Sequence, residues 1–392
     1  MTTTILWGVR LSPFTLKLEA CLRYHDLSYK RLPAEGSYLE NARTLLSLEL
    51  AKKNGKVSRY PTLDADLDEY PAVPFLSEDG KHFQYDSSAI AHYLDSKLST
   101  QSMSPLFPNN NTFNFIAHLI DEAFDEFALY MVHHMRWIGS AKTTPMGKLL
   151  GQEFKRALPP GGAFALSRSF PKRQVRRTPY LFSVAPSGYK AGVSRALTPP
   201  SRQGFPETQT LLNQCWKQYL NAMEHVLDKQ DYLLGDIFSV ADASAYGQLA
   251  MNLVDPEAAE KMRSIAPTTY NWLRRIEQSK HLESRHSSGS LYLSPHLKPL
   301  LNTIMGTFSA LMIQNEKAYN MAREQGETLF NEKAFDQHRA LFDGQLRGYP
   351  FRTVVKTFQV RVWREIKAHW GELSQAEQAE VRTVVDLTEL FD

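Results

Sequence analysis

The sequence predicts an α/β domain at the N-terminus, then an all-helical domain, and finally a mainly helical extension. Strand and helix patterns alternate at first, and from about residue 112 apolar residues recur at the three-to-four spacing of helices. With 392 residues, 43% of them apolar, the chain is too long for one ordinary hydrophobic core and can fill two or three. We therefore expect domains over residues 1–98 and 105–285, and an extension over residues 286–392 that packs on them.

The N-terminal domain is predicted to have the order βαβ, an irregular segment, then ββα. The irregular segment is the polar stretch from Pro33 to Pro71. A strong hairpin signal, Asp79-Gly80, separates the last two strands. The expected strands and helices are, in chain order, residues 4–9, 13–26, 27–32, 73–76, 81–85 and 87–97.

A basic insert over residues 154–205 interrupts the helical domain. It carries ten Lys and Arg residues and no Asp or Glu, and its Pro, Gly and Ser content predicts a long, positively charged loop. Aromatic residues are sparse in it and no recognition motif accompanies it, so we expect no nucleic-acid partner. The alternatives left open are an arm over the active site, an arm at a subunit interface and a flexible loop. The apolar run 178–186 favours packing against the helical domain.

Further helices are expected on the C-terminal side of the insert and in the extension. Ser239 and Asp242 have the spacing of a helix-capping pair, and Ser374 and Glu377 cap a last helix in the same way. Asp343-Gly344 predicts the turn of a hairpin over residues 340–351. The other expected helices are residues 208–229, 268–279 and 353–370, and an apolar stripe from Leu300 to Met312.

The composition argues against several classes of protein. Lys and Arg (45) nearly balance Asp and Glu (42), so charge demands neither a nucleic acid nor a membrane as partner. Cys21 and Cys215 lie far apart in apolar helical patterns, which leaves no disulfide framework and no thiol metal cluster. No apolar run approaches the roughly 18 residues of a membrane span, and the first residues lack a leader pattern. We expect a cytoplasmic protein that binds no metal.

The segment Ser12-Pro13-Phe14-Thr15 is the most informative in the chain, because a predicted strand gives way to a helix there. The first-turn N–H groups of a helix lack intrahelical partners, and the helix dipole adds roughly half a positive charge at that end. An anion is therefore stabilised in front of Ser12. The ordinary interpretation is a helix N-cap. The sharper one is a hydroxyl that holds a thiolate, which would make a bound thiol nucleophilic.

Three segments carry a resemblance to a known family. Ser12-Pro13, Val73-Pro74 and Asp86-Ser87 occur in the order and context found in the cytosolic glutathione S-transferase superfamily, and Phe238–Asp242 resembles the capping motif of its helical domain. The resemblance implies a thioredoxin-like N-terminal domain and an all-helical C-terminal domain. Ser at position 12 is similar to the serine-type members. The insert and the extension lie outside the common fold and resemble an extended bacterial subgroup.

The resemblance also implies the site residues. Ser12 would hydrogen-bond the glutathione thiolate, and the backbone of Val73 before a cis Pro74 would pair with the cysteinyl part. Ser87 and its helix N-terminus would bind the γ-glutamyl carboxylate. The glutathione-binding residues that it implies are Phe14, Lys56, Val73, Pro74, Asp86 and Ser87, with Lys56 as the lysine for the glycyl carboxylate.

The family also implies partners and a reaction. Tyr130, Arg136 and Trp137 would line the pocket of an apolar electrophile, which the glutathione thiolate attacks. A homodimer is expected. The alternative function is a non-catalytic interaction or scaffold protein that uses the same fold, an alternative favoured by the extra C-terminal residues.

Two polar clusters need no catalytic explanation at this stage. His133-His134 lie on different helix faces and no further ligand completes a metal set, so we expect structural or second-site polar residues. Asp121, Glu122, Asp125 and Glu126 are typical of a solvated acidic face, and the basic insert is the alternative partner.

Overall fold

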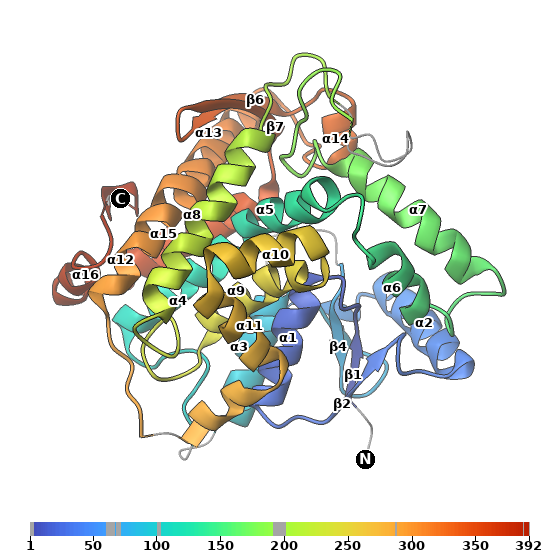
Figure 1. Ribbon diagram of the computed structural model, residues 1–392, viewed down its shortest axis with the longest axis horizontal. Helices are drawn as coiled ribbons and strands as arrows, with labels where there is room; N and C mark the ends of the chain where they lie inside the picture. Colours follow the sequence, from blue (N-terminus) through green and yellow to red (C-terminus); the bar gives the residue numbers. More distant parts are fainter. Residues whose placement is uncertain are drawn as a thin grey trace.

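The computed structural model describes residues 4–59, 67, 72–99, 103–190, 201–286, 288–386 and 388–391. Figure 1 shows a small α/β unit in blue at the lower right and a helical body that reaches from it to the orange and red C-terminal extension. The expected fold class, an α/β domain followed by a helical domain and a mainly helical extension, is confirmed. Among the described residues, no helix combines the length and apolar content needed to cross a bilayer.

The N-terminal unit is built on a five-stranded sheet of order β2-β1-β4-β5-β3. β1 is parallel to β2 and antiparallel to β4, while β5 is antiparallel to β4 and parallel to β3. This is the topology that joins a βαβ unit to a ββα unit. Its elements are β1 (Thr4–Trp7), α1 (Pro13–Tyr24), β2 (Tyr29–Leu32), α2 (Tyr38–Lys53), β3 (Val57–Ser58), β4 (Phe75–Ser77), β5 (Phe83–Gln84) and α3 (Ser87–Leu98).

The helical domain begins with a long rod over residues 111–139. The rod consists of α4 (Asn111–Ala123), a π-helical turn (Phe124–Ala128), α5 (Leu129–His134) and a second π-helical turn (Met135–Gly139). Such π turns re-aim side chains within a helix and occur often at functional sites. The other helices are α6 (Met146–Glu153), α7 (Gly162–Arg177), α8 (Gln209–Leu227), α9 (Val240–Ala250), α10 (Pro256–Ile265) and α11 (Pro267–Glu277), with 3₁₀ turns at Met251–Val254 and Lys280–His286.

The C-terminal extension shares a hydrophobic core with the helical domain. Phe115 of α4 contacts the rings of Trp370 and Phe391, with centroids 5.4 Å apart in both pairs. In Figure 1 the orange helices of the extension lie beside α8, and α15 and α16 also pack on α4. The elements are a 3₁₀ turn (Pro295–Leu297), α12 (Lys298–Ile304), a π-helical turn (Met305–Ser309), α13 (Ala310–Glu324), α14 (Glu332–Asp336), β6 (Leu341–Leu346), β7 (Tyr349–Val354), α15 (Thr357–Glu372), α16 (Gln375–Val381) and a 3₁₀ turn (Thr388–Phe391).

Two segments expected to be irregular contain helices. α2 lies inside the stretch read as irregular and begins with a capping box in which Ser37 and Glu40 satisfy each other's backbone N–H groups. The basic insert contains α7, so the prediction of a long loop is wrong for residues 162–177. The apolar run 178–186 packs against the helical domain, as expected. Phe182 and Val184 are buried, and the ring of Phe182 stacks on that of Tyr130 with centroids 5.4 Å apart.

The hairpin of the extension has its turn at a different place from the one predicted. Leu346 pairs with Tyr349, so the two-residue turn is Arg347-Gly348, and Asp343-Gly344 lies within β6. Both turn residues have positive φ, 51° and 82°, as a tight turn matching the twist of the strands requires.

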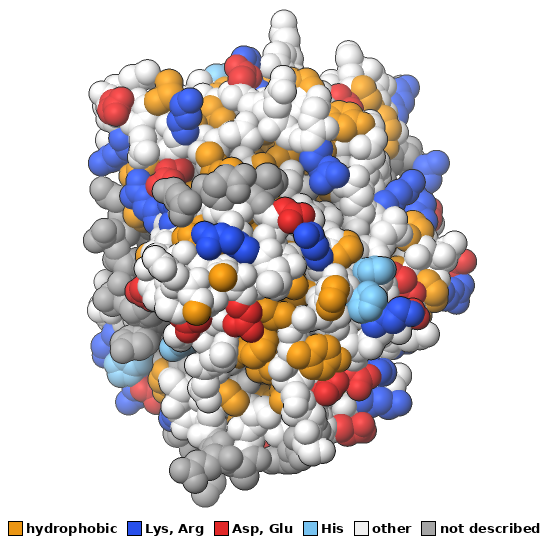
Figure 2. Space-filling model, turned by 90° about the vertical axis from the view of Figure 1, so that its left-hand side faces the viewer, with side chains coloured by type: hydrophobic (Ala, Val, Ile, Leu, Met, Phe, Trp, Pro, Cys, Tyr) orange, Lys and Arg blue, Asp and Glu red, His pale blue; other side chains and the backbone are white. Residues whose placement is uncertain are grey.

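Acidic and basic side chains are interspersed on the face shown in Figure 2, without one large patch of a single sign.

Candidate active site

The segments singled out in the sequence meet at one edge of the sheet. Trp7 at the end of β1 lies opposite Phe75 at the start of β4, so the loop that leads to Ser12 and the Val73-Pro74 step leave the sheet at the same edge. Gln84 at the end of β5 lies opposite Leu76, which brings the start of α3 to that edge as well. The loop that leads to Ser12, the Val73-Pro74 step and the N-terminus of α3 therefore lie at the same edge of the sheet.

Ser12 occupies the N-cap position of α1 without using its hydroxyl as a cap. Its backbone is extended (φ −84°, ψ 125°), and its carbonyl accepts hydrogen bonds from Thr15 and Leu16. No side-chain cap is made, and Pro13 fills the first helical position, where its missing N–H costs nothing. Ser12 and Phe14 are both half-buried. The Val73–Pro74 peptide is cis, as the resemblance implied.

The start of α1 is held in place by a close approach to α9. A Cβ at Gly247 would lie 2.6 Å from the carbonyl oxygen of Pro13 and 2.8 Å from Cβ of Lys17, so only glycine fits. Gly247 therefore allows the helical domain to pack directly against the turn that carries Ser12.

Asp86 and Ser87 form the N-terminus of α3. Asp86 adopts positive φ (70°), which turns its carboxylate back so that Oδ1 accepts hydrogen bonds from Ser88 N (3.1 Å) and Ala89 N (3.2 Å). The other oxygen, Oδ2, lies 2.5 Å from Nε of Arg59 and 3.6 Å from Nη2 of Arg361. Burial would raise the pKa of Asp86, but the two guanidinium groups and these hydrogen bonds lower it below its ordinary value. Ser87 is buried beside them.

Arg59, three residues after the lysine named from the sequence, reaches this edge. Ser58 pairs with Gln84 in the parallel β3–β5 ladder, which places Arg59 directly beside Asp86. Lys56, by contrast, is exposed. Arg59 belongs to no recognisable local sequence motif. Only the pairing of β3 with β5 shows that it lies beside Asp86.

The sequence matches family models for both halves of this arrangement. Residues 6–102 match the N-terminal domain of glutathione S-transferase, and residues 195–280 match its C-terminal domain. The chain thus contains both domains of glutathione S-transferase, one over residues 6–102 and the other over residues 195–280. A search of curated proteins found no match.

Solved structures similar to the chain share little sequence identity with it. The beta-etherase LigF from Sphingobium sp. strain SYK-6 is 16% identical, with a TM-score of 0.43, 72% of this chain covered and 98% of the other. A glutathione S-transferase from Rhodospirillum rubrum is 16% identical, with a TM-score of 0.38 and coverages of 76% and 92%. A glutathione S-transferase from Methylobacillus flagellatus, solved with glutathione bound, is 13% identical, with a TM-score of 0.37 and coverages of 72% and 98%.

Behind α1 the chain buries a cationic residue that sequence patterns did not reveal. Nζ of Lys17 donates to Ser88 Oγ (2.7 Å), Asp121 Oδ1 (2.5 Å) and Asp125 Oδ2 (2.7 Å), and the lysine is fully buried. Asp121 also accepts a hydrogen bond from Ser244 of α9. The expectation of a solvated acidic face is therefore wrong for Asp121 and Asp125, and also for Glu122, which is buried. The contacts of Asp121 and Asp125 tie α1, α3, α9 and the rod over residues 111–139 together.

The three residues expected around a second substrate lie in different environments. Arg136 is fully buried, with Nε 2.8 Å from Asp255 Oδ2 and Nη1 3.2 Å from the carbonyl of Leu11, so it supports the loop before Ser12. Tyr130 is covered by the extension, whose Gln359 donates to its hydroxyl at 2.8 Å and whose Lys356 also contacts it. Of the three residues, only Trp137 lines the hollow of about 230 Å³ beside α6 and α7.

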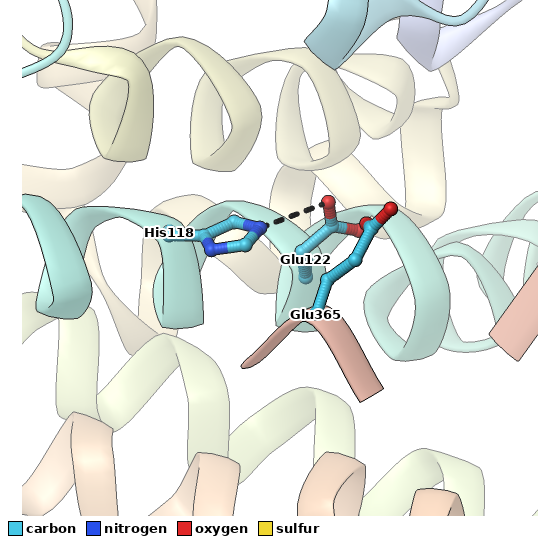
Figure 3. Close-up of side chains that lie close together, drawn as sticks. All are labelled: His118, Glu122 and Glu365. Atoms are coloured by element: carbon cyan, nitrogen blue, oxygen red, sulfur yellow. Dashed lines mark ion pairs between the residues drawn. The ribbon is translucent and has the colours of Figure 1, made fainter. Parts of the chain in front are cut away.

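Two further polar clusters in the described part of the chain are held by hydrogen bonds and ion pairs. His133 and His134 contact Gln174 and Ser183 of the insert, and burial lowers their pKa values to about 3 and about 4, so both are neutral structural residues. Figure 3 shows a group that sequence spacing did not reveal: His118 and Glu122 from α4 face Glu365 from α15, with ligand atoms within 4.8 Å of one another. This donor set could hold a divalent cation.

Proposed function

We propose that the chain binds glutathione along the edge of the sheet and activates its thiol at Ser12 for attack on an apolar electrophile. The observation that carries this proposal is the meeting of Ser12, the cis Val73–Pro74 peptide and the Asp86-Ser87 helix start at one edge. An extended tripeptide lying along that edge would reach all three segments. Its γ-glutamyl end would lie at α3 and its sulfur at α1.

The groups at Ser12 could stabilise a thiolate by enough free energy to ionise a bound thiol at neutral pH. A free thiol has a pKa of about 8.5, so being mostly ionised at neutral pH requires a drop of roughly two units, or about 2.7 kcal/mol. A charge-assisted hydrogen bond contributes about 1.5–3 kcal/mol and a helix N-terminus about 0.3–1 kcal/mol. The Ser12 hydroxyl and the first turn of α1 together are therefore sufficient.

The electrophile would approach from the hollow beside Trp137. Val9 and Leu11, in the loop before Ser12, pack in the same apolar cluster as Trp137, Met146 and Val175. The wall of the hollow is therefore continuous with the loop that positions Ser12. Tyr130, which is covered by Lys356 and Gln359, would support this region from behind.

The test replaces the hydroxyl and follows the bound thiol. Ser12→Ala should raise the pKa of enzyme-bound glutathione by about one to two units, the equivalent of one charge-assisted hydrogen bond. Turnover of an aryl halide at neutral pH should fall at least tenfold. The thiol pKa is read from the ultraviolet absorbance of the thiolate during a pH titration.

A matched control separates this effect from helix capping. Ser374→Ala removes a hydroxyl at the N-terminus of α16, where it accepts a hydrogen bond from Glu377 N, and should leave the thiol pKa unchanged. An unchanged thiol pKa in the Ser12 variant would remove Ser12 from the mechanism.

The alternative function, a non-catalytic interaction protein, is favoured by the cover that the extension places on Tyr130. Isothermal titration with glutathione distinguishes the two. Micromolar to millimolar binding together with aryl halide turnover supports the enzyme, whereas no heat at millimolar glutathione supports the interaction protein.

A further inference from the structure

Arg361 places a guanidinium group from the C-terminal extension at the N-terminus of α3. Its side chain is 11% exposed, Nη2 lies 3.6 Å from Asp86 Oδ2, and Nη1 lies 3.1 Å from Glu365 Oε2 on its own helix. Its Nε is buried and has no hydrogen-bond partner in the described part of the chain. A buried, unpaired N–H on a charged group costs free energy unless a ligand satisfies it.

The charges around Arg361 alternate in sign. Arg59 and Arg361 approach the same oxygen of Asp86, and Glu365 forms an ion pair with Arg361. The first-turn N–H groups of α3 add partial positive charge next to Ser87. Such a surface complements a zwitterion: a carboxylate facing Arg361 and the helix start, and an ammonium group facing Asp86 or Glu365.

The α-amino and α-carboxylate groups of a γ-glutamyl residue form such a zwitterion. We propose that Arg361 binds the α-carboxylate of the γ-glutamyl group of glutathione, beside Ser87, so that the C-terminal extension completes the glutathione site. This inference rests on the proposed function, because it needs glutathione on this edge of the sheet. It gives the extension a role in binding, in addition to its role in the hydrophobic core.

The neighbouring His118, Glu122 and Glu365 support this reading over a metal site. His118 Nε2 lies 3.5 Å from Glu122 Oε1 (Figure 3). Glu365 pairs with Arg361. Each carboxylate thus already has a counter-charge. Glu365 holds the terminal nitrogens of Arg361, while its Nε has no hydrogen-bond partner among the described residues.

The test compares glutathione with an analogue that lacks only the α-carboxylate, γ-aminobutyryl-cysteinyl-glycine. Titration of the full-length protein should show that Arg361→Gln weakens glutathione about tenfold to a hundredfold while the affinity for the analogue changes little. Arg361→Lys keeps the charge but loses the planar guanidinium group. Its affinity for glutathione should lie between those of the parent protein and Arg361→Gln. Arg364→Gln is the matched control: it lies on the same helix, pairs with Glu316 and Asn320, and should bind both ligands like the parent protein.

The possible results separate this inference from the proposed function. If the parent protein fails to bind glutathione at millimolar concentration, the proposed function is wrong. If the parent binds and Arg361→Gln binds glutathione equally well, only the role of Arg361 is overturned. An equal loss for glutathione and for the analogue would also overturn it, because a general structural defect would weaken both. Should Arg361→Gln not fold, the same comparison is made with Arg361→Lys.

Discussion

At the scale of single residues, the buried charges behind α1 make the stability of the fold depend on pH. Lys17 is fully buried between Asp121 and Asp125; burial lowers its pKa, but the two carboxylates raise it above the ordinary value. Burial and the neighbouring Asp121 charge raise the pKa of Asp125 to about 7, although Lys17 opposes them. Lys17 and Asp121 thus form the ion pair, and Asp125 holds a proton below neutral pH.

This arrangement predicts how stability changes with pH. Between the unfolded pKa of Asp125, 3.8, and the folded value of about 7, the folded protein binds the extra proton. The contribution of Asp125 is therefore fully present below pH 4 and is lost as pH rises to about 7. The side chain introduced by Asp125→Asn cannot ionise. The melting temperature of the variant minus that of the parent protein should therefore rise from pH 5 to pH 7 and stay constant above pH 7. A difference that stays constant from pH 5 to 8 would contradict the assignment.

The placement of residues in short local motifs was predictable from the sequence, and contacts between distant partners were not. Ser12, Val73-Pro74 and Asp86-Ser87 each belong to a short motif at the start of a helix or strand. Lys17 meets Asp121 across 104 positions of the chain, and Arg361 comes from the extension. No spacing rule connects such pairs, since only the packing of α1, α4 and α15 brings them together.

At the scale of elements, the helices that the sequence missed lack an apolar stripe facing a core. In α2 the buried positions include polar Asn41 and Thr44, while Leu39, Leu46 and Leu50 are exposed. Periodicity therefore gave no signal, and only the capping box Ser37/Glu40 could have revealed the helix. α7 has one buried residue, Val175, and contains a proline, which explains why the insert was expected to be a loop.

The hairpin of the extension offers a clean test of turn chemistry. Gly348 has φ of 82°, and a Cβ there would meet nothing within 4 Å, so Gly348→Ala adds only backbone strain. The free energy of unfolding should fall by about 1 kcal/mol. Gly371→Ala is the control: Gly371 lies in α15, a Cβ there also meets nothing within 4 Å, and the change should stabilise by a few tenths of a kcal/mol to about 1 kcal/mol. Chemical denaturation of the two variants measures both. Equal effects would contradict a turn at Arg347-Gly348.

At the scale of the whole molecule, the extension and the helical domain form one core. Leu300, Phe308, Trp363 and Ile366 are buried in the same cluster as Phe115 and Tyr219 of the helical domain. Ion pairs also tie the insert to the extension, through Arg177 with Glu332 and Arg202 with Asp336. The apolar stripes of the sequence predicted that the tail would need a partner surface, but not which helices would supply it, because α4 and α8 present apolar residues on several faces.

Removing the extension should therefore affect stability and binding together. A chain of residues 1–289 would expose the faces of α4 and α8 that now contact α12 and α15, and a few hundred Å² of apolar surface at about 25 cal/mol per Å² amounts to several kcal/mol. At about 2–4 °C per kcal/mol, the melting temperature should fall by roughly ten degrees or more, or the protein should aggregate. Co-expression of residues 290–392 as a separate chain should restore solubility and glutathione affinity, because it returns the missing face of the core and Arg361 together. A monodisperse truncated protein that melts within a few degrees of the full chain and binds glutathione equally well would show that the extension is an independent module, and it would remove Arg361 from the glutathione site in the same measurement.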